Sequence, residues 1–408
     1  MVGVLNGVKT MKRYIKLFCL LILIYFILMT GVYLIPDSWI QNNMNNAIEY
    51  IENKEGRYSN FYYVMVGATT DSWTDISELG KTLLNDGEKN LIERAMDNGS
   101  YARYWHGNHV IMRIMFIFMS YLQIRYISQF IVIGAISFAF AMVWRKGGIG
   151  IGSIFLASII PTFPFTISLN FQYMIPFLVM LFGVIYMCAN RYNDTNMGCF
   201  FFVIGSLINF LDLLTFPLVT LLMPLILDMV LRIRHKKYTG FENFIISMKY
   251  SLIWVSGYAL TWVSKWVLAT MILRKNICLD AINSVMYRSG NDGGGNKIGR
   301  LEAVKRCAGV YFMTMPKLTY FVILLTILIL MIYSLKYHRN FKRTILQTWS
   351  LMPLALFPVF WIFILANHSY LHFSFVYRIY MGSSFAVGCF CVEYVRVIRE
   401  AAEEYSEQ

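Results

Sequence analysis

The sequence is poor in charged residues, and acidic residues are the scarcer kind. Asp, Glu, Lys and Arg make up 14% of the 408 residues, with 23 acids against 36 bases, whereas soluble domains carry roughly 25% charged residues. Hydrophobic residues make up 57% of the chain, so this composition excludes an ordinary water-soluble domain. The seven cysteines form no C-x-x-C pair. Five of them are most simply small apolar packing residues: Cys19, Cys188, Cys199, Cys389 and Cys391. We see no internal repeat.

Long apolar runs are what the sequence does contain. Several reach about 20 residues, the length that crosses a hydrocarbon core of roughly 30 Å. We therefore predict an all-α, polytopic integral membrane protein of about ten transmembrane helices, with residues 1–408 forming one transmembrane domain. The first run is too long for a signal peptide and has no A-x-A cleavage site, so we expect it to be retained; translation could begin at Met11. The predicted spans are 17–35, 127–143, 149–164, 174–188, 198–211, 216–231, 250–272, 318–335, 351–366 and 375–395.

The net charge of +13 invites a nucleic-acid interpretation, which the position of the basic residues argues against. Basic clusters at 12–16, 145–146, 232–237 and 336–343, together with Arg191, fall on one side of the ten-span trace. By the positive-inside rule that side is the cytoplasm. We therefore predict a multi-pass membrane protein with both termini in the cytoplasm, a short polar tail at 396–408, and no nucleic-acid partner.

Two long segments are left on the outer face, at about 36–125 and 274–317. In the first, "YWHGNHVIMRIMFIFMSYLQIR" is apolar but interrupted by Arg113, which predicts amphipathic helices lying in the membrane interface. The second contains "RSGNDGGGNKIGR" and is basic, so it could close over an anionic donor as a lid, or simply attract anionic lipid or wall polymer. Cys278 and Cys307 fall in this segment and could pair in an oxidising compartment.

An acidic motif, "TTDSWTD", lies in the first outer segment. Asp71 and Asp75 are four residues apart and so share one face of a helix. A carboxylate in a partly dry pocket can remove a proton from an acceptor hydroxyl during sugar transfer, while the second carboxylate orients the acceptor or a cation. The competing interpretation is a capped, solvated helix start, because Asp, Ser and Thr are good N-cap residues.

Aromatic and basic residues follow in "ARYWHGNHVIMR". Tyr104 and Trp105 could stack on a sugar ring, and Arg103, His106 and Arg113 could face a phosphate. The same residues are also typical of an interfacial aromatic belt with snorkelling cations.

Further polar residues are expected at the outer ends of later spans. Lys265, between two tryptophans, either snorkels outward or neutralises a lipid phosphate, and Asp212 in "NFLDLLTFP" should lie at the same depth. In "ANHSYLHFSFVYR", His368 and His372 are four residues apart and Arg378 follows. These residues could hydrogen-bond a donor phosphate or sugar hydroxyls, or form an ordinary histidine pair at headgroup level.

Four histidines fall at the outer surface and would form a metal site only if they all converged. No sequence rule brings them together, so we predict no metal site and no cofactor, with a role for a divalent cation left open. These histidines are His106, His109, His368 and His372.

The segments "DSWTD", "RYWHG", "NFLDLLTFP", "WVSKWVLA" and "NHSYLHFSFVYR" resemble an uncharacterised bacterial branch of membrane proteins related to the GT-C superfamily of glycosyltransferases. The order of features is similar too: a retained first span, a long outer loop with an acidic motif, and then many spans joined by short loops.

This resemblance implies a sugar donor carried on polyprenyl phosphate or diphosphate, transfer on the outer face, and inversion at the anomeric carbon. The general base would be Asp71 or Asp75. Contacts to the donor phosphate would come from Lys265, Arg300, Arg378 and His368, and contacts to the sugar or acceptor from Tyr104, Trp105, His106, Asp212 and His372.

Two features depart from the superfamily pattern. Its acidic motif usually lies close after the first span, where this sequence has Asp37-Ser38-Trp39 instead, so Asp37 is a reserve candidate for the base. The chain also shows no large soluble C-terminal domain, so we expect a glycan, lipid or wall-polymer acceptor rather than an asparagine sequon.

The leading hypothesis is therefore an inverting membrane glycosyltransferase that uses a lipid-linked donor and contacts membrane lipids. One alternative is a transporter or flippase of lipid-linked saccharides, which buried charge in mid-span or inverted repeats would favour. Another is a polysaccharide polymerase whose base lies in a later loop, near His368 or Arg378.

Overall fold

The computed structural model describes residues 2–56, 68–83, 89–190, 194–235, 238–291, 297–313 and 316–406. Over these ranges the chain is helical and forms no β-sheet, which confirms the all-α class. Three parts of the sequence predictions lie outside the described residues: Arg191, the end of the basic cluster at 236–237, and most of the glycine-rich run at 292–296.

The first half of the chain contains one long helix, then a group of short helices, and then the first helices of the bundle. These helices are α1 (Val2–Val32), α2 (Asp37–Tyr50) with a π-helical end (Ile51–Glu55), α3 (Ser72–Leu83), α4 (Leu91–Asp97), α5 (Asn108–Phe118), α6 (Tyr121–Ile159), α7 (Pro164–Ser168) and α8 (Phe171–Ala189).

The second half contributes the remaining bundle helices and the short helices that connect them. They are α9 (Asp194–Leu211), α10 (Val219–Arg234), α11 (Gly240–Leu273), α12 (Ile277–Ser289), α13 (Arg300–Phe312), α14 (Pro316–Lys336), α15 (Phe341–Thr348), α16 (Phe357–Ile364), α17 (Ala366–Leu371), α18 (Phe373–Val376) and α19 (Tyr380–Ser406).

Five helical stretches of the described residues are long and apolar enough to cross a membrane: Thr10–Val32, Tyr121–Thr162, Phe171–Ala189, Phe341–Ile364 and Phe373–Glu404. This pattern is compatible with a multi-pass membrane protein. Helices α9, α10, α11 and α14 coincide with four further predicted spans. The count of ten spans stays a prediction.

Helix α6 is 39 residues long and bends sharply at one glycine. As a straight helix it would measure about 58 Å, nearly twice the thickness of a hydrocarbon core. Gly148 has φ 71° and ψ 170°, which is not helical. A Cβ added to Gly152 would lie 3.1 Å from the Phe140 ring, whereas residues 12 apart on a straight helix are separated by about 18 Å. The chain therefore reverses at Gly148, between the predicted spans 127–143 and 149–164.

The centre of the bundle is α10, which is buried on nearly every side and packs against α8, α19, α11 and α9. Its neighbours α9 and α11 approach each other closely. A Cβ on Gly205 would lie 2.2 Å from the Trp254 carbonyl oxygen, and a Cβ on Gly257 would lie 2.2 Å from the Phe202 carbonyl oxygen. Small residues let helix backbones meet in this way.

One group of charged residues in the bundle lies near the C-terminal end of α10. Arg232 Nε donates to Asp228 Oδ2 at 2.8 Å, and Arg234 Nε donates to Glu393 Oε1 at 2.7 Å, which joins α10 to α19. Each arginine is thus paired within the protein.

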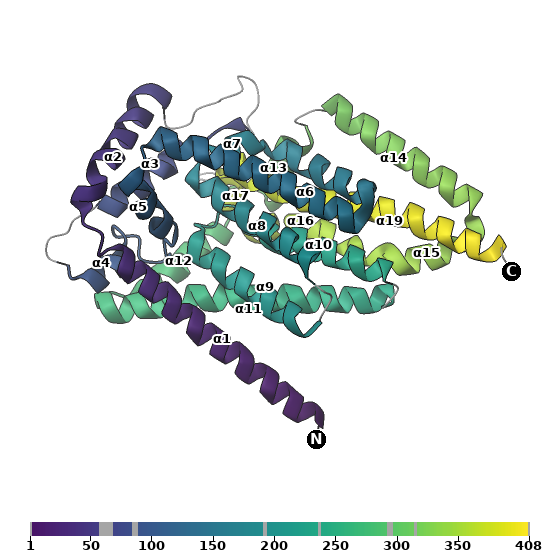
Figure 1. Ribbon diagram of the computed structural model, residues 1–408, viewed down its shortest axis with the longest axis horizontal. Coiled ribbons are helices and arrows are strands. Elements are labelled where there is room, and N and C mark those ends of the chain that lie inside the picture. Colours follow the sequence, from purple (N-terminus) through teal and green to yellow (C-terminus); the bar gives the residue numbers. More distant parts are fainter. Residues whose placement is uncertain are drawn as a thin grey trace.

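Helices α2, α3, α4 and α5 gather at one end of the molecule, and the N- and C-termini lie toward the other end (Figure 1). We call these four helices the cap. Helix α5 ends at Phe118, and α6 begins with a capping box formed by Ser120 and Gln123. The predicted interface helix is therefore two helices, of which α5 is half-buried against α1 and α2.

Helix α13 belongs to the second outer segment and packs against α16 and α17. The proposed pairing of Cys278 with Cys307 is not present, because both are free thiols. Cys278 lies beside Thr270 Oγ1, and Cys307 Sγ donates to the Ser369 carbonyl oxygen at 3.5 Å. The two thiols therefore have different surroundings.

Candidate functional site

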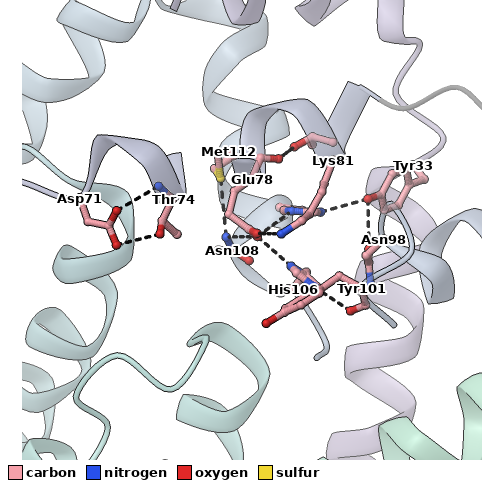
Figure 2. Close-up of polar contacts among 12 residues, drawn as sticks. Tyr33, Asp71, Thr74, Glu78, Lys81, Asn98, Tyr101, His106, Asn108 and Met112 are labelled. Carbon is pink, nitrogen blue, oxygen red and sulfur yellow. Dashed lines mark hydrogen bonds and ion pairs between the residues drawn. The ribbon is translucent and has the colours of Figure 1, made fainter. Parts of the chain in front are cut away.

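Asp71 caps the first helix of the acidic motif. Its carboxylate accepts hydrogen bonds from the Thr74 backbone amide at 3.2 Å and from the Thr74 hydroxyl at 2.8 Å (Figure 2). Its carbonyl oxygen accepts from Asn170 Nδ2 at 2.9 Å. These contacts satisfy a free amide at the start of α3, so Asp71 has the N-cap role that the sequence left as an alternative.

Asp75 lies one turn further along α3 and is held differently. Its Oδ2 accepts a hydrogen bond from the Tyr121 hydroxyl at 3.1 Å and a longer one from the Phe171 amide at 3.5 Å. Tyr121 begins α6 and Phe171 begins α8, so the carboxyl group lies where three helices meet. Only 1% of Asp75 is exposed.

An ion pair braces the far side of Tyr121. Arg125 contacts Glu55 through two nitrogens, at 2.5 and 3.0 Å, and its guanidinium lies 4.3 Å from the Tyr121 ring centroid. Glu55 also accepts from the Ser72 hydroxyl at 3.0 Å. The brace joins the end of α2 to the starts of α3 and α6 and so orients the Tyr121 hydroxyl toward Asp75.

Burial changes the acidity of the carboxyl groups in this region. It raises the pKa of Asp75 to about 8, although the charge of Arg125 acts in the opposite direction. Burial raises the pKa of Asp212 to about 7 and also raises the pKa of Asp71. Carboxyl groups poised near neutral pH are suited to accept and return protons.

Asp75 and Asp212 line one small cavity, which has room for roughly one water molecule. Three of its lining residues carry a buried oxygen that has no hydrogen-bond partner among the described residues: Asn108 Oδ1, Gln172 Oε1 and Asp212 Oδ1. Unpaired buried acceptors are costly, so this cavity is suited to a hydrogen-bond donor. The lining residues are Asp75, Glu78, Asn108, Phe171, Gln172, Ile175, Leu211, Asp212 and Leu213.

A second polar cluster adjoins the cavity through Glu78. Glu78 Oε2 lies 2.7 Å from His106 Nδ1 and 3.1 Å from His109 Nε2, and Asn108 Nδ2 donates to the same oxygen at 3.1 Å (Figure 2). Lys81 Nζ donates to Glu78 Oε1 at 2.7 Å. Glu78, His106 and His109 are all buried.

A close backbone contact positions this histidine turn. The Gly107 amide donates to the Phe210 carbonyl oxygen at 2.8 Å, and a Cβ at Gly107 would lie 2.6 Å from that oxygen and 2.5 Å from the Phe210 ring. His106 has a positive φ of 54°, which costs free energy in a residue with a Cβ. The end of α9 therefore holds "HGNH" in a shape that suits glycine at its centre.

We expect Gly107→Ala to destabilise the protein, because the added methyl group has no free space. Overpacking of this kind costs about 1–3 kcal/mol, which should appear as a lower midpoint in a thermal unfolding scan of the purified protein. Gly134→Ala is the matched control, since a Cβ there meets nothing within 4 Å. Equal midpoints for the two variants would contradict the assignment.

Tyr104 and Trp105 point into the protein, so neither presents a face to a sugar in this structure. Trp105 is fully buried, and its Nε1 donates to the Thr261 carbonyl oxygen at 2.8 Å. Tyr104 is buried between Tyr101, with ring centroids 5.5 Å apart, and Arg288, which donates to its hydroxyl. Arg103 pairs with Asp280 at 3.0 Å instead of facing a bound phosphate.

Lys265 is also fully buried, which excludes the predicted snorkelling. Its Nζ donates to the Met96 carbonyl oxygen at 2.8 Å, in the last turn of α4, and lies 5.5 Å from the Trp105 ring centroid. A cation at a helix C-terminus is favourable. Lys265 therefore fastens α11 to the cap in this structure and does not line the Asp75 cavity.

The second histidine pair lies against the loop that carries Asp212. His368 Nε2 donates to the Leu214 carbonyl oxygen at 2.9 Å, and the His368 and His372 rings are 4.8 Å apart. Burial lowers the pKa of His368 well below its ordinary value and that of His372 to about 4. This pair does not join His106 and His109 in one cluster, so the four histidines do not converge.

Arg378 is buried, and Tyr173 lies between it and the acidic motif. Its guanidinium is 4.3 Å from the Tyr173 ring centroid, and Nε donates to the Thr162 carbonyl oxygen at 3.1 Å. Asp71 and Asp75 are close enough to Tyr173 to act on it electrostatically as well. Arg300, in contrast, is partly exposed and contacts Asn291 and the Phe363 carbonyl oxygen.

The reserve base, Asp37, is held by two arginines. Arg113 Nη2 donates to its Oδ1 at 2.8 Å, and Arg94 pairs with its Oδ2. Both carboxylate oxygens of Asp37 are therefore engaged in ion pairs. Arg113 itself is fully buried and so does not face a ligand phosphate here.

Several residues of the site were not singled out from the sequence: Glu78, Asn108, Tyr121 and Arg125. A usable signal existed for Glu78, because Asp71, Asp75 and Glu78 follow the i, i+4, i+7 spacing of one helix face. Tyr121 and Arg125 looked like part of an interface helix, and only their contacts with Asp75 and Glu55 give them a role.

Comparison of the chain with protein-family models, with curated proteins and with solved structures finds no match.

Proposed function

We propose that the protein is a membrane glycosyltransferase, which moves a sugar from a polyprenyl-phosphate-linked donor to a glycan, lipid or wall-polymer acceptor with inversion. The observation that supports this most directly is Asp75, a buried carboxyl group of raised pKa at the wall of a cavity with partnerless acceptor oxygens. The short motifs shared with the GT-C superfamily point to the same chemistry.

Asp75 has the features required of a general base. Tyr121 and the Phe171 amide fix its orientation, and its raised pKa makes it a stronger proton acceptor than a solvated aspartate. The cavity has room for about one hydroxyl group and not for a sugar ring. In this proposal the acceptor presents one hydroxyl to Asp75, and its remaining parts lie outside the cavity.

The proposed step conserves atoms and charge. The acceptor oxygen bonds to the anomeric carbon, the bond from that carbon to the donor phosphate oxygen breaks, and the acceptor proton passes to Asp75. The polyprenyl phosphate leaves as an anion, which a nearby cation stabilises. Two candidates are Arg125, whose charge acts on Asp75, and Arg378, which acts on Tyr173 together with Asp71 and Asp75.

The membrane arrangement is part of the proposal. The cap that carries Asp75 would face the outside of a bacterial plasma membrane, with ten spans beneath it and both termini in the cytoplasm. The position of the cap at the end opposite both termini supports this arrangement (Figure 1). So does the positive charge of the predicted inner loops.

We expect the rate of transfer to rise with pH. Asp75 must be ionised to accept a proton, and because its pKa is raised to about 8, most of it is protonated at pH 6. Membranes containing the protein, supplied with a panel of polyprenyl-phosphate sugars and with cell envelope from cells lacking it, should form a new glycosidic bond. The initial rate should increase through about pH 8.

Matched membranes without the protein serve as the control for this assay. A pH-independent rate between pH 6 and 9 would exclude Asp75 as the base. If the labelled donor crosses the membrane of sealed vesicles and no new glycosidic bond forms, the protein is a flippase and not a transferase. A bond that joins repeat units of one polysaccharide would identify a polymerase instead.

A further inference from the structure

The cluster of Glu78, His106 and His109 carries an inference that does not depend on the transferase proposal. One donor atom from each residue lies within 4.8 Å of the other two, and all three side chains are buried. Helix α3 supplies the carboxylate, and the turn at the start of α5 supplies both imidazoles. His106 points toward the carboxylate (Figure 2), and His109 Nε2 lies 3.1 Å from it.

The contact made by His106 Nε2, the ring nitrogen on the side away from Glu78, shows which ring nitrogen carries the proton. Nε2 lies 3.2 Å from the Tyr101 carbonyl oxygen, and a carbonyl oxygen only accepts hydrogen bonds. Nε2 therefore carries the proton. In a neutral ring the lone pair is then on Nδ1, which lies 2.7 Å from Glu78 Oε2.

His109 is oriented in the same sense. Its Nδ1 lies 3.0 Å from the Tyr33 hydroxyl, and that hydroxyl donates to Asn98 Oδ1 at 3.2 Å. The hydroxyl therefore accepts a hydrogen bond from His109 Nδ1–H. The lone pair of neutral His109 is then on Nε2, 3.1 Å from Glu78 Oε2.

Two imidazole lone pairs and a carboxylate oxygen thus converge on one point. With both rings neutral, three acceptors at such distances repel each other unless a proton or a metal cation lies between them. We propose that Glu78, His106 and His109 bind a single divalent transition-metal ion of the zinc type through Glu78 Oε2, His106 Nδ1 and His109 Nε2.

The geometry and the surroundings fit such an ion. Tetrahedral zinc with bonds of about 2.0–2.1 Å to nitrogen and oxygen places its ligand atoms about 3.3 Å apart. The spacings from Glu78 Oε2 to His106 Nδ1 and His109 Nε2, 2.7 and 3.1 Å, would have to widen by about 0.6 and 0.2 Å. The outer ring nitrogens donate to a carbonyl and a hydroxyl, and Lys81 and Asn108 hydrogen-bond the carboxylate. Partners of this kind orient metal ligands.

Charge and access fit as well. The charges of Glu78 and Lys81 cancel, so a bound divalent ion adds two positive charges to a buried site. The carboxyl groups of Asp75 and Asp212 line the cavity that Glu78 also lines, and when ionised they balance those charges. The same cavity has room for one water molecule, which would complete a fourth coordination position.

The test uses the full chain, purified in nanodiscs with a tag that contains no histidine. After treatment with a chelator and loading with Zn²⁺, we expect one zinc per chain by elemental mass spectrometry. Glu78→Gln and His109→Asn should weaken zinc binding by at least about 10–100-fold, the loss seen even for outer-shell partners. Co²⁺ should give visible ligand-field absorption with wild type and not with these variants.

The matched control changes the other histidine pair, in a double variant His368→Asn and His372→Asn, which should keep one zinc per chain. Equal zinc content in Glu78→Gln and wild type, or wild type without zinc, would overturn the proposal and leave protonated imidazoles as the cation. If Glu78→Gln fails to fold, the thermal midpoint of chelated wild type decides. Zn²⁺ but not Mg²⁺ should raise it by several degrees, and no increase overturns the site.

Discussion

Asp75→Asn should abolish glycosyl transfer while leaving the protein folded. A general base contributes about 10²–10⁴-fold to a rate, and an amide cannot take the acceptor proton. Folding should tolerate the change, because Asp75 is largely protonated at neutral pH and the asparagine oxygen can still accept from Tyr121. The readout is restoration of surface glycans, measured by mass spectrometry, in cells lacking the protein, with membrane levels of each variant confirmed.

The matched control for Asp75→Asn is the same substitution four residues earlier. Asp71 acts as the N-cap of α3, and asparagine is about as good as aspartate at that position. Asp71→Asn should therefore restore the glycan fully. If Asp75→Asn also restores it, the base lies elsewhere, and Asp212→Asn becomes the informative variant, because Asp212 lines the same cavity.

Arg113→Met should lower the stability of the whole cap. The guanidinium donates to three carbonyl oxygens, those of Val32, Ile35 and Thr82, at 3.2, 2.6 and 2.8 Å. Val32 ends α1 and Thr82 lies in the last turn of α3, where carbonyls lack helical partners. Arg113 also pairs with Asp37. Removing one partner of a buried ion pair costs about 3–5 kcal/mol, a large part of the roughly 5–15 kcal/mol that stabilises a typical protein.

The measurement is the midpoint temperature of thermal unfolding of the purified protein. It is monitored by the loss of the monodisperse peak in gel filtration. Arg343→Met is the control, because Arg343 and Glu404 form an exposed pair of a kind worth about 0–1 kcal/mol. Arg113→Lys should recover part of the loss, since an ammonium group cannot reach all three carbonyls in one plane. A wild-type midpoint for Arg113→Met would show that the cap does not depend on this residue.

The two predictions separate the roles that polar residues have in the cap. The sequence suggests that Arg113, Trp105 and Lys265 contact a ligand, because basic and aromatic residues at a membrane surface often serve that purpose. In the structure all three are buried and hydrogen-bonded to backbone carbonyls. They join α1, α4, α5 and α11 into one body, and this leaves the carboxyl groups of α3 as the candidates for chemistry.

Local sequence patterns predict the all-α class, the positions of the apolar helices, the reversal near Gly148 and the helix start at "TTDSWTD". These properties depend on neighbours within a few turns, namely hydropathy over about 20 residues, a glycine that can adopt positive φ, and N-cap chemistry. A single chain therefore displays them without any knowledge of its folded neighbours.

Which polar residues contact one another is visible only once the helices are packed together. Asp75 contacts Tyr121 from 46 positions away, and Glu78 contacts His106 from 28 positions away. The same packing places His368 and His372 apart from His106 and His109, although both pairs have helical spacing. The reason is that burial and contact depend on how helices pack around α10 and against the cap. That packing follows from the shapes of many side chains at once, which no local pattern records.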